Sequence, residues 1–212
     1  MKKGKSDWRD GFLFVGNQLT LDFLNTCPVQ EGEPSELLPD FSALLHWFQT
    51  AGLLSREEIE SIQQKWGKTA KAKEITAAMR EFRELLRGEI LAWENGGAIR
   101  GSTITELNRL MAEHPMCMRL KTGRRTPSTE LWFDSHEPED LFAPLAHNAA
   151  TLFANVDRRG VRKCPTCVLH FYDTSKKGTR RWCSMRMCGN RRKVAAYATR
   201  QRIQDRRTPK GS

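Results

Sequence analysis

The stretch "RRWCSMRMCGNRRK" (180–193) decides how the end of this chain folds, because it joins two cysteines and six cations without a single acidic residue. Another pair of cysteines lies upstream, in "CPTC" (164–167). The full spacing is Cys164-x2-Cys167-x15-Cys183-x4-Cys188. Two close pairs with such an interval between them are typical of a tetrahedral structural zinc site.

Other interpretations of the four cysteines compete with zinc. A CxxC pair is also a redox motif, but redox chemistry gives no reason for the second pair. Two disulfides require an oxidising compartment, and "MKKGKSDWRDG" (1–11) lacks the apolar segment of a signal peptide. Four free cysteines or an iron–sulfur cluster are the remaining alternatives. We predict Zn²⁺ as the cofactor, and a structural one, because four thiolates leave no coordination position open.

The residues between the two pairs predict a hairpin that brings the pairs together. Phe171 and Tyr172 favour a strand, and "KKG" (176–178) favours a turn. His170 is an alternative ligand, but in this strand we expect it to face solvent. The expected result is a treble-clef-like zinc module.

The charge of the chain divides at the same place. The net charge is +10, but residues 1–157 carry 18 Lys/Arg against 23 Asp/Glu, a balance of −5. Residues 158–212 carry 17 Lys/Arg against 2 acids, a balance of +15. A field concentrated in this way attracts polyanions, with nucleic acid favoured over an anionic membrane surface. A solvated tail is the alternative.

The residues that follow Cys188 predict a basic helix, because alanines and long side chains favour helix. We expect Val194, Tyr197 and Ala198 to pack on the zinc module while the cations stay exposed. The side chains expected to contact nucleic acid, mostly at phosphates, are Arg180, Arg181, Arg191, Arg192, Lys193 and Arg200. A helix that is merely solvated is again the alternative.

The first 157 residues predict a mainly α-helical domain with a small β-hairpin, which makes the fold class α+β. Capping and periodicity predict an extended piece and short helix in 12–26 and helices from Asp40 to Gly52, after Ser55, from about 70 to 93, after a Thr103–Glu106 capping box, and over 138–156. Alternation within 116–133 predicts the hairpin. We place the boundary in "DRRGVRK" (157–163), which gives domains at 1–157 and 160–212.

Few residues of the N-terminal domain suggest chemistry. Asp22, Asn25 and Thr26 are polar residues in an apolar stretch, and together with Arg83 they form a candidate ligand pocket. The competing interpretation is that Asn25 and Thr26 cap a helix end and Arg83 lies on a solvated face. The sequence has no Gly-rich phosphate loop, nucleophile elbow or HExxH motif, so we do not expect an enzyme.

These motifs resemble known families. "CPTC … FYDTS … RRWCSMRMCGNRRK" is similar to the CGNR zinc finger, named for the tetrapeptide at 188–191 here. "GNQLTLDFLNT" (16–26), "DFSALLHWFQTAGLL" (40–54) and "MREFRELL" (79–86) resemble the ABATE domain that accompanies this finger. The resemblance covers nearly the whole chain and implies a bacterial stress-induced transcription regulator whose finger contacts DNA.

We therefore expect a cytoplasmic transcription regulator that binds DNA through the zinc module and has no membrane partner. The N-terminal domain is expected to sense a small-molecule effector or to mediate assembly, for example as a homodimer. The alternatives are an RNA-binding protein, a protein-interaction adaptor, and an enzyme that uses an N-terminal pocket and keeps the finger as a tether.

Overall fold

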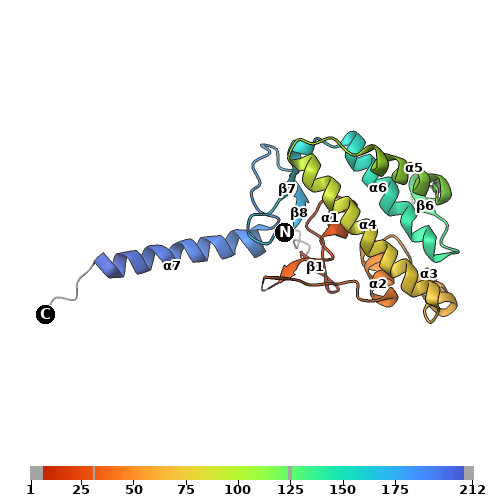
Figure 1. Ribbon diagram of the computed structural model, residues 1–212, viewed down its shortest axis with the longest axis horizontal. Coiled ribbons are helices and arrows are strands. Elements are labelled where there is room, and N and C mark those ends of the chain that lie inside the picture. Colours follow the sequence, from red (N-terminus) through yellow and green to blue (C-terminus); the bar gives the residue numbers. More distant parts are fainter. Residues whose placement is uncertain (1–6, 31, 124–125, 208–212) are drawn as a thin grey trace.

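The computed structural model describes residues 7–30, 32–123 and 126–207, and it shows a helical body from which one long helix projects (Figure 1). The described helices of the body are α1 (Leu19–Leu24), α2 (Phe41–Ala51), α3 (Arg56–Trp66), α4 (Ala70–Glu94), α5 (Gly101–Glu113) and α6 (Phe142–Asn155). Helix α1 packs against both α4 and α6, and its Phe23 and Leu24 are fully buried. A bilayer-spanning helix would need a longer apolar run than any described helix offers.

Local sequence signals set several helix ends where they are predicted. The Asp40 carboxylate accepts a hydrogen bond of 2.9 Å from the Ala43 N–H and so caps α2. Gly52 ends this helix with a φ of 78°, in the left-handed region that favours glycine. Ser55 and Glu58 form the predicted capping box at the start of α3. The predicted helix over 138–156 is present as a 3₁₀ turn (Pro138–Leu141) that continues into α6.

The capping box predicted from Thr103 and Glu106 is wrong. Helix α5 begins at Gly101, so Thr103 lies inside its first turn. The Thr103 hydroxyl donates to the buried Glu89 carboxylate on α4 at 2.9 Å, and the Arg100 N–H donates to it at 3.1 Å. A partner from another helix therefore replaces the local cap.

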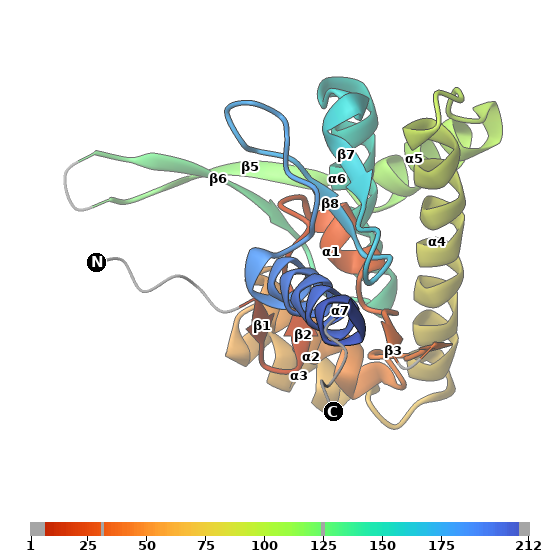
Figure 2. The same ribbon diagram turned by 90° about the vertical axis from the view of Figure 1, so that its left-hand side faces the viewer.

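The strands of the described residues form four separate antiparallel pairs. These pairs are β1 (Trp8–Arg9) with β2 (Phe12–Leu13), β3 (Val29–Gln30) with β4 (Glu33–Pro34), β5 (Met116–Lys121) with β6 (Ser128–Phe133), and β7 (Val161–Lys163) with β8 (His170–Tyr172). The predicted hairpin is β5–β6, which extends away from the helices (Figure 2). Its Met118 and Leu131 pair across the strands and are exposed, as is Leu120. The homodimer stays a prediction.

The zinc module and the helical body are interlocked. Leu13 and Val15, near the start of the described chain, lie in one buried cluster with Leu169 and Phe171 of the zinc module. The Tyr172 N–H donates to the Gly16 carbonyl at 2.7 Å. The fold class is confirmed as a mainly helical domain followed by a small zinc module with a basic helix, whereas the domain boundary stays a prediction.

Candidate zinc centre and nucleic-acid interface

The sulfur atoms of Cys164, Cys167, Cys183 and Cys188 all lie within 4.8 Å of one another. The Cys167 and Cys183 sulfurs are 3.3 Å apart, and the Cys183 and Cys188 sulfurs are 3.7 Å apart. A tetrahedral zinc ion with Zn–S bonds of about 2.3 Å requires sulfur–sulfur distances of about 3.8 Å. The number, type and spacing of these donors therefore fit one Zn²⁺ ion.

The backbone holds the first cysteine pair in a tight turn. The Cys164 N–H donates to the Leu169 carbonyl at 2.8 Å, and the Val168 N–H donates to the Cys164 carbonyl at 3.0 Å. Val168 has a φ of 58°, an unusual value for a β-branched residue, which reverses the chain after Cys167. Strands β7 and β8 flank this turn and fix its position.

The second pair lies at the start of a helix, with Cys183 just before the cap of a helical turn and Cys188 within that turn. The Ser184 hydroxyl oxygen accepts hydrogen bonds of 3.1 Å from the Arg186 N–H and 3.3 Å from the Met187 N–H. This cap starts the π-helical turn Met185–Gly189, which contains Cys188 and continues into α7 (Asn190–Arg207). One pair in a hairpin and one at the start of a helix is the treble-clef-like arrangement predicted.

The hairpin expected between the two cysteine pairs is wrong in position. The strands pair around the first cysteine pair, and the residues after β8 form a loop instead. The buried Asp173 carboxylate closes this loop, because it accepts hydrogen bonds of 2.9 Å from the Ser175 N–H and 2.8 Å from the Arg180 N–H. The Asp173 side chain thus closes this segment by hydrogen bonds, where the sequence predicts a pairing strand.

The crowded thiols favour a cation. The side chains of Cys164 and Cys167, followed by burial, raise the pKa of Cys183, and burial raises the pKa of Cys188. Thiolates at such short distances repel one another in a buried site. A bound zinc ion supplies the positive charge with which all four sulfurs can be deprotonated.

His170 was expected to face solvent, and the structure shows that this is wrong, because it is only 1% exposed. The cause is Asn25, whose side chain makes two hydrogen bonds to the His170 backbone. Its Oδ1 accepts from the N–H at 2.9 Å, and its Nδ2 donates to the carbonyl at 2.9 Å. Strand β8 is thereby held against α1, and the ring lies inside, 3.8 Å from the Glu94 carboxylate on α4.

Replacing Asn25 with alanine should therefore loosen the zinc module from the body. The change leaves two buried backbone groups without partners, at a cost of about 1–3 kcal/mol each, so we expect a loss of about 2–6 kcal/mol in the free energy of unfolding. Urea unfolding measures this loss. Asn95→Ala is the control, because exposed Asn95 also donates to a backbone carbonyl, at 2.7 Å. Equal losses in the two variants would count against the role assigned to Asn25.

The residues of the predicted ligand pocket do not all face one another. The Thr26 hydroxyl accepts from Arg83 at 3.0 Å, so these two lie together. The Asp22 carboxylate instead accepts from the Gly16 N–H at 2.7 Å, and Asn25 faces His170. Asn25 is also the C-cap of α1, as the competing interpretation expected.

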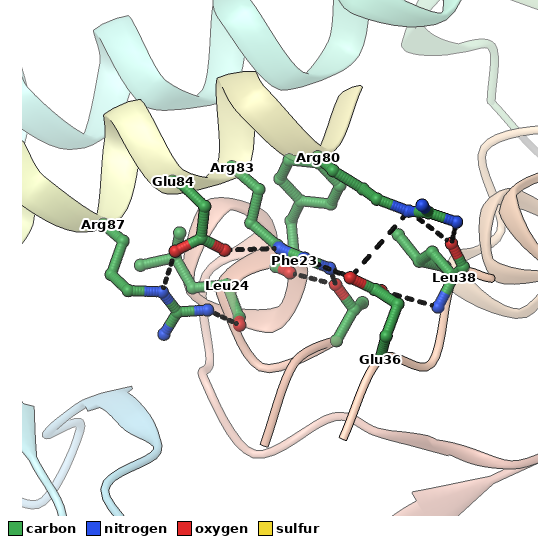
Figure 3. Close-up of polar contacts among 9 residues, drawn as sticks. Phe23, Leu24, Glu36, Leu38, Arg80, Arg83, Glu84 and Arg87 are labelled. Atoms are coloured by element: carbon green, nitrogen blue, oxygen red, sulfur yellow. Dashed lines mark hydrogen bonds and ion pairs between the residues drawn. The ribbon is translucent and has the colours of Figure 1, made fainter. Parts of the chain in front are cut away.

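Arg83 is the centre of an ion-pair network that reaches across α4 (Figure 3). Its guanidinium lies 2.5 Å from Glu36 and 3.0 Å from Glu84. Burial is the largest single influence on Glu36 and opposes its charge, but the hydrogen bonds from Arg83 and the Leu38 N–H, together with the charges of Arg83 and Arg80, keep the pKa of Glu36 below its usual value. Arg80 adds a hydrogen bond of 2.8 Å to the Leu38 carbonyl. Glu36 is the ion-pair partner of Arg83 that the sequence did not indicate, because it lies in a loop forty-seven positions away.

Most of the cations predicted to meet nucleic acid are exposed. They are Arg181, Arg191, Arg192, Lys193 and Arg200, and Arg186 on the second cysteine turn joins them. Within the described side chains, none of these six forms an ion pair with a carboxylate. Arg180 differs, since its guanidinium donates to the Trp182 carbonyl at 2.9 Å and lies 4.6 Å above the Phe171 ring. It therefore holds the module together.

Helix α7 extends away from the body as a single rod (Figure 1). The expectation that Val194, Tyr197 and Ala198 pack on the zinc module is wrong, since all three are exposed, Val194 at 67% and Tyr197 at 59%. The core of the module is already filled by Leu13, Val15 and Phe171. Residues near the start of the described chain thus complete this core, and the main contacts of α7 among the described residues are with the turn that precedes it.

Comparison with protein families agrees with this anatomy. The family described as "ABATE: Putative stress-induced transcription regulator" matches residues 17–156, more than half of the chain. The family described as "CGNR zinc finger" matches residues 161–201. Neither description names an enzyme, and a search of curated proteins finds no significant match. The chain belongs to the ABATE family and carries a CGNR zinc finger at its C-terminal end.

Proposed function

We propose that this protein is a bacterial, cytoplasmic transcription regulator that binds DNA through α7 and the second cysteine turn. The observation that carries the proposal is a row of exposed cations, none of them in an ion pair among the described side chains, on a helix that projects from the body and follows the zinc centre. Both family descriptions agree with a regulator of this kind.

The shape and charge of α7 suit a DNA groove. Its 18 residues correspond to a length of about 27 Å at 1.5 Å per residue. An α-helix fits the major groove of B-DNA, which is about 12 Å wide. Arginine and lysine side chains along such a helix bind mainly phosphates, so the affinity should depend steeply on salt.

The test is binding of the zinc-loaded protein to random-sequence duplex DNA at several salt concentrations. Changing Arg191, Arg192 and Lys193 to alanine removes up to three phosphate contacts. We expect the slope of log affinity against log salt to fall by about 2.7, because each contact contributes about 0.9. At about 0.1 M salt, and relative to 1 M salt, a change of 2.7 in this slope corresponds to a loss of affinity of up to about 500-fold.

The matched control changes three exposed cations of the helical body, Arg56, Lys68 and Lys73, to alanine, which alters the net charge equally. Its binding should stay close to that of the unchanged protein. If both triple variants lose the same affinity, the interaction follows net charge and α7 has no special part in it. If folded, zinc-loaded protein binds no duplex at low salt, the proposal fails. Competition with structured RNA then decides whether RNA is the partner.

A further inference from the structure

A cavity of about 270 Å³ opens where α4, the β3–β4 pair and the zinc module meet. Its wall is mainly apolar, formed by Val29, Pro34, Leu91, Val168 and Leu169. Its polar members are Cys27, Glu84, Arg87, Lys163 and His170. The cavity thus belongs to both family domains, and none of the residues of the predicted pocket lines it.

His170 gives this cavity an unmet hydrogen-bonding capacity. Neither ring nitrogen has a hydrogen-bond partner among the described residues, although both are buried. Such buried unpaired groups are rare and costly, and a missing ligand is one explanation for them. Burial, with the positive charges of Arg87 and Lys163, lowers the pKa of His170 to about 4. The neutral ring can donate one hydrogen bond and accept another.

The cavity also has unused positive charge. Arg87 donates through Nε to Glu84 at 2.9 Å and through Nη2 to the Leu24 carbonyl at 2.8 Å, as Figure 3 shows. Its Nη1 has no partner in the described structure. The exposed Lys163 forms no ion pair with a described carboxylate. Among the described residues that line the cavity, Glu84 is the one acid, and it is already bound by Arg83 and Arg87. The carboxylate of Glu94 lies outside this lining, where one oxygen accepts from the Lys163 N–H at 2.7 Å and the other lies 3.8 Å from the His170 ring.

We propose that this cavity binds a small organic acid with an apolar body. Arg87 and Lys163 bind the carboxylate, and the His170 ring N–H donates to it. The apolar body lies against Leu91 and Leu169. The volume is close to the lower limit of about 300 Å³ for ligand pockets, which selects a compact molecule.

Ligand binding here also links the two parts of the chain. Arg87 and Leu91 belong to α4, whereas Lys163 precedes the zinc-site residue Cys164 and His170 lies in β8. A ligand that contacts both sides stabilises the arrangement in which the zinc module is docked on the body. The site therefore gives the proposed regulator a means to respond to a metabolite.

The experiment uses the full, zinc-loaded chain with hexanoate and benzoate as probes, and with hexanamide and benzamide as uncharged counterparts. We expect at least one acid to bind with a dissociation constant on the order of 1 mM or below, because few atoms contribute. In NMR spectra the signals of the His170 ring should move most among the five histidines. Each amide should bind at least fivefold more weakly than its acid.

Two variants test the location of the site. Lys163→Gln should weaken acid binding at least fivefold. Lys176→Gln, which removes another exposed cation of the zinc module, should leave it unchanged. Leu91→Trp fills the cavity and should abolish binding. Zinc content and circular dichroism confirm that each variant is folded.

Two outcomes contradict the proposal. If the amides bind as well as the acids, the ligand is not recognised as an anion, and if none of the four probes binds, the cavity is not a ligand site. No step depends on DNA, so this result and that of the DNA experiment are independent.

Discussion

Replacing Cys183 with serine is expected to remove zinc from the protein and to unfold the module that carries α7. Cys183 is fully buried, and its sulfur lies 3.3 Å from that of Cys167 and 3.7 Å from that of Cys188. Zinc binding contributes about 10–16 kcal/mol to folding in zinc-finger peptides. The loss of most of this free energy is larger than the stability of a small module without a large core, so the module should unfold.

The change should show in two measurements. The zinc content should fall from about one ion per chain to nearly none. Hydrogen exchange should accelerate in β7 and β8 and also in β2, because Leu13 packs in the same cluster as Cys183. The core of α2 and α4 should keep its protection, because that cluster is separate.

Cys117→Ser is the matched control, since Cys117 lies exposed on β5 and outside the cluster. This variant should retain one zinc ion and unchanged hydrogen exchange in the zinc module. A Cys183→Ser protein that still holds a full equivalent of zinc would refute the four-cysteine centre. If hydrogen exchange becomes rapid in β7 and β8 but β2 stays protected, the idea that Leu13 and the zinc module share one core would instead be refuted.

The features that the sequence predicts well are determined by neighbours in the chain. The caps of α2 and α3 involve residues three positions apart, Asp40 with Ala43 and Ser55 with Glu58. The cysteine spacing is similar in kind, because each close pair can direct two sulfurs at one ion through a single turn. Such signals need no knowledge of the rest of the molecule.

The failed predictions share a different cause. Helix α5 starts earlier than expected because Glu89 on α4 binds Thr103. His170 is buried because Asn25, at a separation of 145 residues, binds its backbone. A pattern of residues within one segment carries no information about a partner on another element, so these contacts were not accessible from the sequence.

The exposed face of α7 illustrates the same limit. Val194 and Tyr197 are apolar or aromatic and lie at helical spacing, which favours packing. The core they were expected to cover is instead completed by Leu13 and Val15, from the other end of the chain. Periodicity identifies a face that can be buried, but the identity of its partner depends on the whole fold.

Asp22→Asn is expected to make the protein more stable at pH 8 than the unchanged chain. Burial raises the pKa of Asp22 to about 7, although the hydrogen bond from the Gly16 N–H and the charge of Arg9 oppose this shift. The folded protein therefore keeps a proton that the unfolded chain releases near pH 4. The stability contributed by this group is complete below about pH 4, and it is lost as the pH rises to about 7.

The size of the effect follows from the shift. A difference of about three pKa units corresponds to about 4 kcal/mol over the whole range, of which about 3 kcal/mol falls between pH 5 and pH 8. Asparagine keeps an oxygen that can accept from the Gly16 N–H but cannot ionise, so its variant should not show this fall. Urea unfolding at pH 5 and pH 8 should reveal a stability difference between the two proteins that grows by about 3 kcal/mol.

The control is Asp10→Asn, which removes an exposed carboxylate from the same N-terminal segment and should give a difference that changes by less than about 0.5 kcal/mol. If the difference in unfolding free energy between Asp22→Asn and the unchanged protein is equal at pH 5 and pH 8, the folded protein holds charged Asp22 without losing stability. The hydrogen bond from Gly16 and the charge of Arg9 would then have to outweigh burial. The Gly16 carbonyl also accepts from the Tyr172 N–H at 2.7 Å, so Gly16 contacts both Asp22 and the zinc module.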